Sequence, residues 1–226
     1  MSIRPVQQVR NLVPIKNVMI SAYDKRFIED FVIGLIETCP GVHFYSSGGT
    51  YAKLKEFLGD KTSCLTEVSE YTGQAEIEGG LVKTLHHKLF LGYLAEENCA
   101  NHQEALVREN AVMIDLYIGN LYPFSDVIKK AGATIETARG NIDVGGPSAL
   151  RAAAKNFLRV LTVTNPHRYS SILLILKETG GCSTFESRLN GAQKTFRLLS
   201  EYDTAITRYL YEISPEEALT AYELID

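Results

Sequence analysis

NVMISAYDKRFIEDFVIGLIETCPGVHFYSSGGTYAKLKEFL, residues 17–58, decides the fold because it passes through strand, helix, strand and helix in turn. Residues 17–23 form an apolar run typical of a buried strand. Apolar positions then recur on one helical face until Pro40 ends the helix. A second strand over 42–47 leads through two glycines into a helix over 50–58. This alternation predicts an α/β protein built on a mainly parallel sheet.

The rest of the chain continues the same alternation. Residues 64–69, 112–124 and 159–164 read as further strands, and 112–124 suits a central strand whose carboxyl end opens into a site. A Gly-rich stretch over 70–80 has neither the helical nor the strand period, as expected of a functional loop. Helices are predicted over 102–110, 147–156, 167–179, 184–212 and 214–225. The predicted organisation is a short N-terminal extension, 1–16, and one domain, 17–226, whose part from 167 to 226 is mostly helical.

Composition excludes several classes of protein. The 226 residues carry a net charge of -4 and are 45% hydrophobic, which fits a folded globular chain and gives no footprint for nucleic-acid binding. No stretch reaches the roughly 18 apolar residues of a membrane span, and the N-terminus is unlike a signal peptide. The four cysteines lack the short spacings of zinc or redox motifs and are expected to be reduced, so a cytoplasmic location is predicted.

Two turns carry candidate chemistry. SSGGT (46–50) joins a strand to a helix, where glycines and helix N–H groups can hold a phosphate, with Ser21 and Lys25 beside it. A tight turn without a ligand is the alternative. GGLVKTLHHK (79–88) gathers Lys83 with two histidines. Because His86 and His87 are adjacent and cannot share a helical face, they are expected to be solvated rather than metal ligands.

A third candidate is NIDVGGPSALRAAAKN, residues 141–156. Asp143 precedes a Gly-Gly-Pro helix start, and Ser148, Arg151 and Lys155 then share one helical face. The neighbouring positive charge of Arg151 can tune Lys155 toward acid/base chemistry. An ordinary solvated basic face is the competing interpretation.

Five blocks in order, SSGGT, VSEYTG (68–73), VKTLH (82–86), NLYPF (120–124) and NIDVGGPSALRAAAKN, closely resemble the IMP cyclohydrolase domain of the bifunctional purine-biosynthesis family. The resemblance extends from about Val18 to Leu210. It implies a methylglyoxal-synthase-like, doubly wound sheet with a helical C-terminal addition. It also implies a homodimer and a purine ribonucleotide as the small-molecule ligand.

The resemblance implies site residues position by position. Catalytic roles fall on Lys83, Tyr122, Asp143 and Lys155. The implied substrate-binding residues are Ser21, Asp24, Lys25, Ser46, Ser47, Gly48, Gly49, Thr50, Val82, Thr84, Gly119, Asn120 and Val144. Two departures affect the expected pocket, since Leu81 replaces the family's usual Arg and Tyr23 replaces a Ser. Losing the Arg removes five donors and a fixed charge, so binding is expected to be rebuilt, weakened or altered.

The implied reaction closes the purine ring of a formamidoimidazole carboxamide ribotide, giving inosine monophosphate and water. It needs neither metal nor organic cofactor, because no redox step or carbanion is involved. Another polypeptide, a formyltransferase, would supply the formylated substrate. One alternative is a non-catalytic purine-nucleotide-binding or regulatory module. A second alternative is a phosphate-eliminating enzyme resembling methylglyoxal synthase. The NLYPF block and the RAAAKN helix favour the cyclohydrolase over it.

Overall fold

A five-stranded parallel sheet forms the centre of the computed structural model, which describes residues 5–75 and 84–225. The strands are β2 (Asn17–Ala22), β3 (His43–Ser46), β4 (Leu65–Glu67), β5 (Leu116–Asn120) and β6 (Leu161–Val163), in the order β4-β3-β2-β5-β6. Each neighbouring pair is parallel. A parallel sheet covered by helices on both faces confirms the predicted α/β, doubly wound class.

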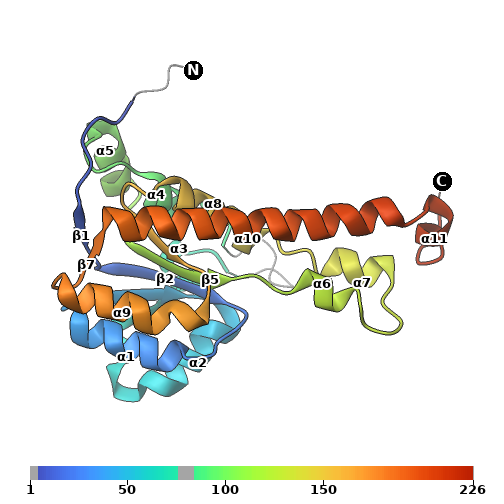
Figure 1. Ribbon diagram of the computed structural model, residues 1–226, viewed down its shortest axis with the longest axis horizontal. Coiled ribbons are helices and arrows are strands. Elements are labelled where there is room, and N and C mark those ends of the chain that lie inside the picture. The colour runs from blue at the N-terminus through green and yellow to red at the C-terminus, as the bar shows by residue number, and fades with distance from the viewer. Residues whose placement is uncertain (1–4, 76–83, 226) are drawn as a thin grey trace.

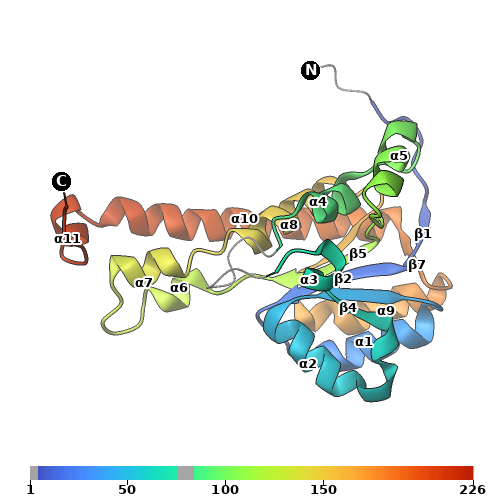
Figure 2. The ribbon, with the colours of Figure 1, turned by 180° about the vertical axis from the view of Figure 1, so that it is seen from behind.

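Helices cover both faces of this sheet (Figures 1 and 2). On one face lie α1 (Ile28–Thr38), α2 (Gly48–Leu58) and α9 (Tyr169–Glu178), and on the other α4 (His87–Leu94), α8 (Gly145–Lys155) and α10 (Phe185–Glu212). The shorter helices are α3 (Val68–Thr72), α5 (Ala100–Arg108), α6 (Phe124–Val127), α7 (Ile135–Gly140), α11 (Pro215–Leu219) and the 3-10 turns η1 (Gly59–Cys64) and η3 (Pro166–Arg168).

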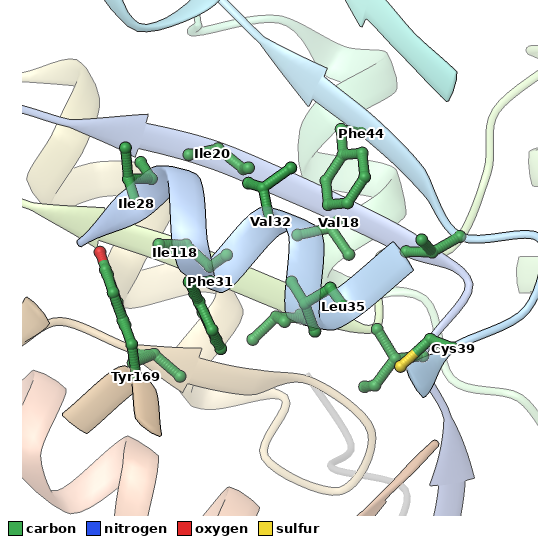
Figure 3. Packing of buried hydrophobic residues seen from close by; sticks show 14 of the residues in the cluster. Val18, Ile20, Ile28, Phe31, Val32, Leu35, Cys39, Phe44, Ile118 and Tyr169 are labelled. Carbon is green, nitrogen blue, oxygen red and sulfur yellow. The ribbon is translucent and has the colours of Figure 1, made fainter. Parts of the chain in front are cut away.

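The strand alternation divides the core into two layers. Val18 and Ile20 of β2 pack with α1 and α9, whereas Met19 between them packs with the α8 and α10 layer. Figure 3 shows Phe31 of α1 against this first layer, where its ring stacks on Tyr169 with centroids 4.3 Å apart. Both faces of the central strands are therefore buried, which explains their nearly continuous apolar sequences.

Helix α10 is 28 residues long, about 42 Å at 1.5 Å per residue, and only part of it covers the sheet. Where it crosses β6, a Cβ added to Gly191 would lie 2.6 Å from the Thr162 carbonyl oxygen, so only glycine permits this approach. The Thr195 hydroxyl donates to the Thr162 hydroxyl at 2.8 Å. The remainder of α10 extends past the sheet beside α6 and α7 (Figure 1). There the Phe124 and Tyr209 rings meet edge to face.

The segment before β2 is part of the domain. Residues Leu12–Pro14 form β1, which pairs antiparallel with β7 (Cys182–Thr184), and Val13 and Ile15 are buried. Fully buried Arg188 holds this segment by donating to the carbonyl oxygens of Arg10 and Asn11. Burial, with a smaller contribution from Arg159, lowers the pKa of the Arg188 guanidinium to about 10. Residues 12–15 thus belong to the folded core rather than to a detached extension.

Candidate active site

Several of the predicted site residues lie at the carboxyl edge of the sheet, where β2, β3 and β5 end side by side. From β2 the chain continues to β3 on one side, and β5 lies on the other side. The strand order therefore reverses next to β2. Crevices at such a reversal are the usual ligand sites of doubly wound sheets.

The SSGGT turn forms a cradle in which two side chains, Ser46 and Thr50, form hydrogen bonds within the protein. Buried Ser46 donates its hydroxyl to the Ile20 carbonyl at 2.8 Å, and Thr50 donates to the Ala22 carbonyl at 3.0 Å. Ser47 is extended and Gly48 is left-handed, with φ of 54°, so the chain turns sharply into α2. Because the Ser46 and Thr50 hydroxyl protons serve the scaffold, the donors available to an anion are the Ser47 hydroxyl and the backbone N–H groups that begin α2.

Lys25 is the cation that follows β2. Its ammonium approaches the Tyr23 carbonyl oxygen at 3.4 Å. Burial lowers the pKa of Lys25, and the positive charge of Lys53 on α2 lowers it further, so Lys25 lies within electrostatic range of α2. Neighbouring Asp24 is bound by Arg26 at 2.6 Å, and this contact lowers the pKa of the Asp24 carboxyl.

Asn120 ties the ends of β2 and β5 together. Its side-chain oxygen accepts from the Asp24 N–H at 2.7 Å, and its side-chain nitrogen donates to the Asp24 carbonyl at 2.9 Å. At adjacent Gly119, an added Cβ would lie 2.8 Å from the Ser21 carbonyl oxygen. Both residues therefore act here as scaffold. The Asn120 amide is already hydrogen-bonded to Asp24, and no side chain would fit beside Gly119.

A second group of site residues meets at the start of α8. The Asp143 carboxylate accepts from the Gly146 N–H at 3.0 Å, and a Cβ at Gly145 would lie 2.5 Å from the Thr84 hydroxyl oxygen. Thr84 thus lies against the same helix end as Asp143, and Val144, between Asp143 and Gly145 in sequence, is 59% exposed. The carboxylate both fixes the turn and remains beside the edge of the sheet.

Two tyrosines that sequence reasoning missed support this group. The Tyr202 hydroxyl of α10 accepts from the Asp143 N–H at 2.7 Å. Tyr117 of β5 is buried beneath the site, where burial first and the Asp143 charge second raise its pKa, while a hydrogen bond with Ser21 opposes the rise. Both lie in stretches that read as ordinary core, so no sequence signal distinguished them.

The structure does not bring every predicted residue together. Lys155 and Asp143 lie at opposite ends of α8, about 18 Å apart along a helix that rises 1.5 Å per residue. Tyr122 follows β5 and contacts Tyr23 edge to face, with ring centroids 4.5 Å apart. Lys83, Val82 and Leu81 lie outside the described residues. His86 accepts from the Lys88 N–H and so caps α4.

A cavity of about 620 Å³ opens on the β6 side of Asn120. Tyr23 and the loop after β6 form part of its wall, and the far side is α10. Its charged lining residues are Asp24, Arg26, Arg168, Lys194, Arg197 and Glu201. The lining is therefore net positive, although the whole chain carries -4. Among residues 5–75 and 84–225, no three His, Cys, Asp or Glu side chains group as metal ligands.

Two known protein families match consecutive parts of the chain. Residues 28–148, more than half of the chain, match the MGS-like domain model. The chain belongs to the MGS-like domain family. This confirms the methylglyoxal-synthase-like fold expected from the sequence. Within this MGS-like domain protein, residues 153–224 also match the AICARFT/IMPCHase bienzyme model, so the region from Asp143 to Tyr202 spans both matches.

Curated relatives of this MGS-like chain include PurH proteins. It is 42% identical over 201 residues to the bifunctional purine biosynthesis protein PurH of Listeria monocytogenes, covering 89% of this chain and 38% of that protein. The PurH of Chlorobaculum parvum is 43% identical over 197 residues, covering 87% and 36%. The chain thus spans less than two fifths of these relatives.

A solved structure is similar over most of the chain. The crystal structure of ForH matches with a TM-score of 0.73 and 30% sequence identity. The match covers 85% of this chain and 97% of ForH, so the likeness extends over nearly all of that chain. In the described parts of the MGS-like chain, no helix is long and apolar enough to cross a bilayer.

Proposed function

We propose that the protein is an IMP cyclohydrolase acting in purine biosynthesis, on formamidoimidazole carboxamide ribotide. The observation that carries the proposal is the pairing, at one sheet edge, of an anion cradle at the start of α2 with the Asp143 and Thr84 group at the start of α8. Similarity to the PurH proteins supports a purine ribonucleotide as the ligand.

The reaction requires the protein to position the reacting groups of the substrate and to transfer protons. The carboxamide nitrogen forms a bond to the formyl carbon and loses one proton, the formamido nitrogen loses a second, and the bond from carbon to the former formyl oxygen breaks so that this oxygen leaves with both protons as water. Because both reacting groups belong to one substrate, the protein mainly fixes the rotamer that brings them to roughly 3 Å. Ring closure changes no oxidation state, so neither metal nor organic cofactor is required by its chemistry.

Each site residue has a proposed task. The cradle N–H groups of Ser47–Thr50 and the Lys25 ammonium bind the ribotide phosphate. Asp143 orients the carboxamide or accepts its proton, while Tyr122 and Lys83 stabilise the developing oxygen charge and the leaving oxygen. Lys155 transfers a proton. Thr84 contributes a hydroxyl next to Asp143 at the base end.

The position of Lys155 supports the proposed homodimer. Lys155 is exposed at the end of α8 opposite Asp143, too distant to serve the same substrate within one chain. In a two-fold dimer, Lys155 of one copy would serve the site built around Asp143 of the other. Catalysis would then require contributions from two chains.

Mixing two inactive variants tests this arrangement. We expect Lys155→Ala and Asp143→Asn homodimers each to be inactive, and a 1:1 mixture, unfolded and refolded together, to recover about a quarter of wild-type turnover. Half of the randomly formed dimers would be mixed, and each would hold one intact site. No recovery, with mixed dimers demonstrated by differently tagged chains, would contradict a shared site.

The activity itself is tested by incubating the protein with synthetic formylated ribotide and following purine absorbance. We expect enzyme-dependent appearance of inosine monophosphate. Nucleotide binding without ring closure would favour the alternative, a non-catalytic purine-nucleotide-binding or regulatory module. In the cell, we propose a cytoplasmic enzyme whose formylated substrate comes from a separate formyltransferase active site. The unpaired cysteines at positions 39, 64, 99 and 182 suit a reducing compartment.

A further inference from the structure

Tyr23 and Tyr122 form an aromatic pair across the ends of β2 and β5. Their ring centroids are 4.5 Å apart and the ring planes meet at 72°, an edge-to-face contact. Two hydrogen bonds between the Asp24 backbone and the Asn120 side-chain amide tie the two loops together, one residue after Tyr23 and two residues before Tyr122. The backbones that carry both rings are therefore held in register by a separate, directional contact.

The Tyr122 side chain has few other restraints. Within the described residues, no hydrogen bond fixes its hydroxyl, although the ring is only partly exposed. The direction of that hydroxyl is thus set by packing, and the Tyr23 ring supplies a well-defined contact. Tyr23 also lines the cavity of about 620 Å³, so the residue that contacts Tyr122 is part of a cavity wall as well.

We propose that Tyr23 is a positioning residue that aims the Tyr122 hydroxyl at the substrate, and this proposal rests on the proposed function. Half of the Tyr23 surface, 51%, is exposed, so the ring is not needed to fill the core. Aromatic edge-to-face pairs favour one relative orientation of the two rings. Removing the Tyr23 ring releases the Tyr122 ring into additional rotamers and opens one of its sides to the cavity.

The experiment compares Tyr23→Ala with Tyr23→Phe, which keeps the ring and removes the hydroxyl. We expect Tyr23→Ala to lower kcat about tenfold, with KM within about twofold, because a positioning contact acts on the aligned transition state. Tyr23→Phe should retain wild-type kcat. Tyr211→Ala, at an 89% exposed tyrosine on α10, is the matched control and should change neither constant.

A double-mutant cycle separates positioning from direct contact. If Tyr23 acts only through the Tyr122 hydroxyl, Tyr23→Ala should cause no further loss of kcat in the Tyr122→Phe background. An equal tenfold loss in that background, or a Tyr23→Phe loss as large as that of Tyr23→Ala, overturns the proposal. Tyr23→Leu replaces Tyr23→Ala if the alanine variant does not fold.

A spectroscopic readout is independent of turnover. In protein labelled with fluorotyrosine, the Tyr122 signal is assigned by its loss in Tyr122→Phe. We expect Tyr23→Ala to shift this signal and Tyr211→Ala to leave it in place. An unchanged signal in Tyr23→Ala overturns the proposal. A shifted signal in a protein that closes no ring supports the ring contact and shows that the proposed function, not the positioning, has failed.

Discussion

Replacing Asp143 by Asn should lower kcat for ring closure by at least about 100-fold, the scale of one lost acid/base group. The asparagine side-chain oxygen can still accept from the Gly146 N–H, which the carboxylate accepts at 3.0 Å. The Tyr202 hydroxyl can likewise still accept the backbone N–H of residue 143. The substitution therefore removes charge and basicity while preserving the turn into α8.

Steady-state absorbance measurements at saturating substrate would give kcat, and calorimetric titration with inosine monophosphate would show whether binding is retained. Asp203→Asn is a suitable control, because that carboxylate is exposed on α10 and pairs with Arg151 at 3.1 Å. We expect the control to keep wild-type kcat. If Asp143→Asn turns over within about threefold of wild type, the proposed role of its charge is wrong.

The second large effect concerns stability, at the amino end of the sheet. Arg159→Met should reduce the free energy of unfolding by about 3–5 kcal/mol at pH 7, because it leaves a buried carboxylate without its cation. That carboxylate, Asp115, is fully buried and pairs with the Arg159 Nη2. It also accepts from the Lys16 and Asn17 N–H groups at 2.9 and 2.8 Å. These two bonds keep the site polar but supply no neutralising charge.

The loss of unfolding free energy in Arg159→Met should be smaller at low pH. Burial raises the pKa of Asp115 above its usual 3.8 despite the opposing effect of Arg159, and removing Arg159 raises the pKa further. The folded variant then holds a proton at pH values where the unfolded chain does not. Its stability therefore increases as pH falls through the raised pKa toward the ordinary value of 3.8, and the gap from wild type narrows over that interval.

Urea unfolding at several pH values would measure this effect. The matched control is Arg197→Met, whose pair with Glu201 on α10 is largely exposed, and it should leave the free energy of unfolding close to that of the wild type. A pH-independent loss for Arg159→Met would contradict the carboxylate explanation, because a packing defect alone would not titrate.

The parallel sheet was predictable because its strands are buried on both faces. The runs at 17–23, 42–47 and 159–164 contain β2, β3 and β6, with ends displaced by one or two residues. The run at 112–124 contains β5, but the ordered strand is limited to Leu116–Asn120. The pairing of β1 with β7 was not predicted, since three-residue strands have too few positions to show a period.

The candidate site was only partly predictable for a different reason. Motif spacing indicated the SSGGT turn and Asp143 because turns and helix starts require particular residue types. Tyr117 and Tyr202 were missed, since a buried tyrosine in an apolar pattern looks the same whether or not its hydroxyl supports a functional group. The family resemblance grouped Asp143 with Lys155 as catalytic residues, whereas the length of α8 separates them.

The β1 and β7 pairing has a consequence for how the protein is made. Val13 pairs with Ser183, so the ribosome releases the first strand about 170 residues before its partner. All five strands of the parallel sheet, through Val163, emerge earlier than β7. Until β7 and Arg188 are synthesised, β1 has neither its partner strand nor the guanidinium that binds the Arg10 and Asn11 carbonyls, so the pairing of β1 with β7 must be one of the last steps of cotranslational folding.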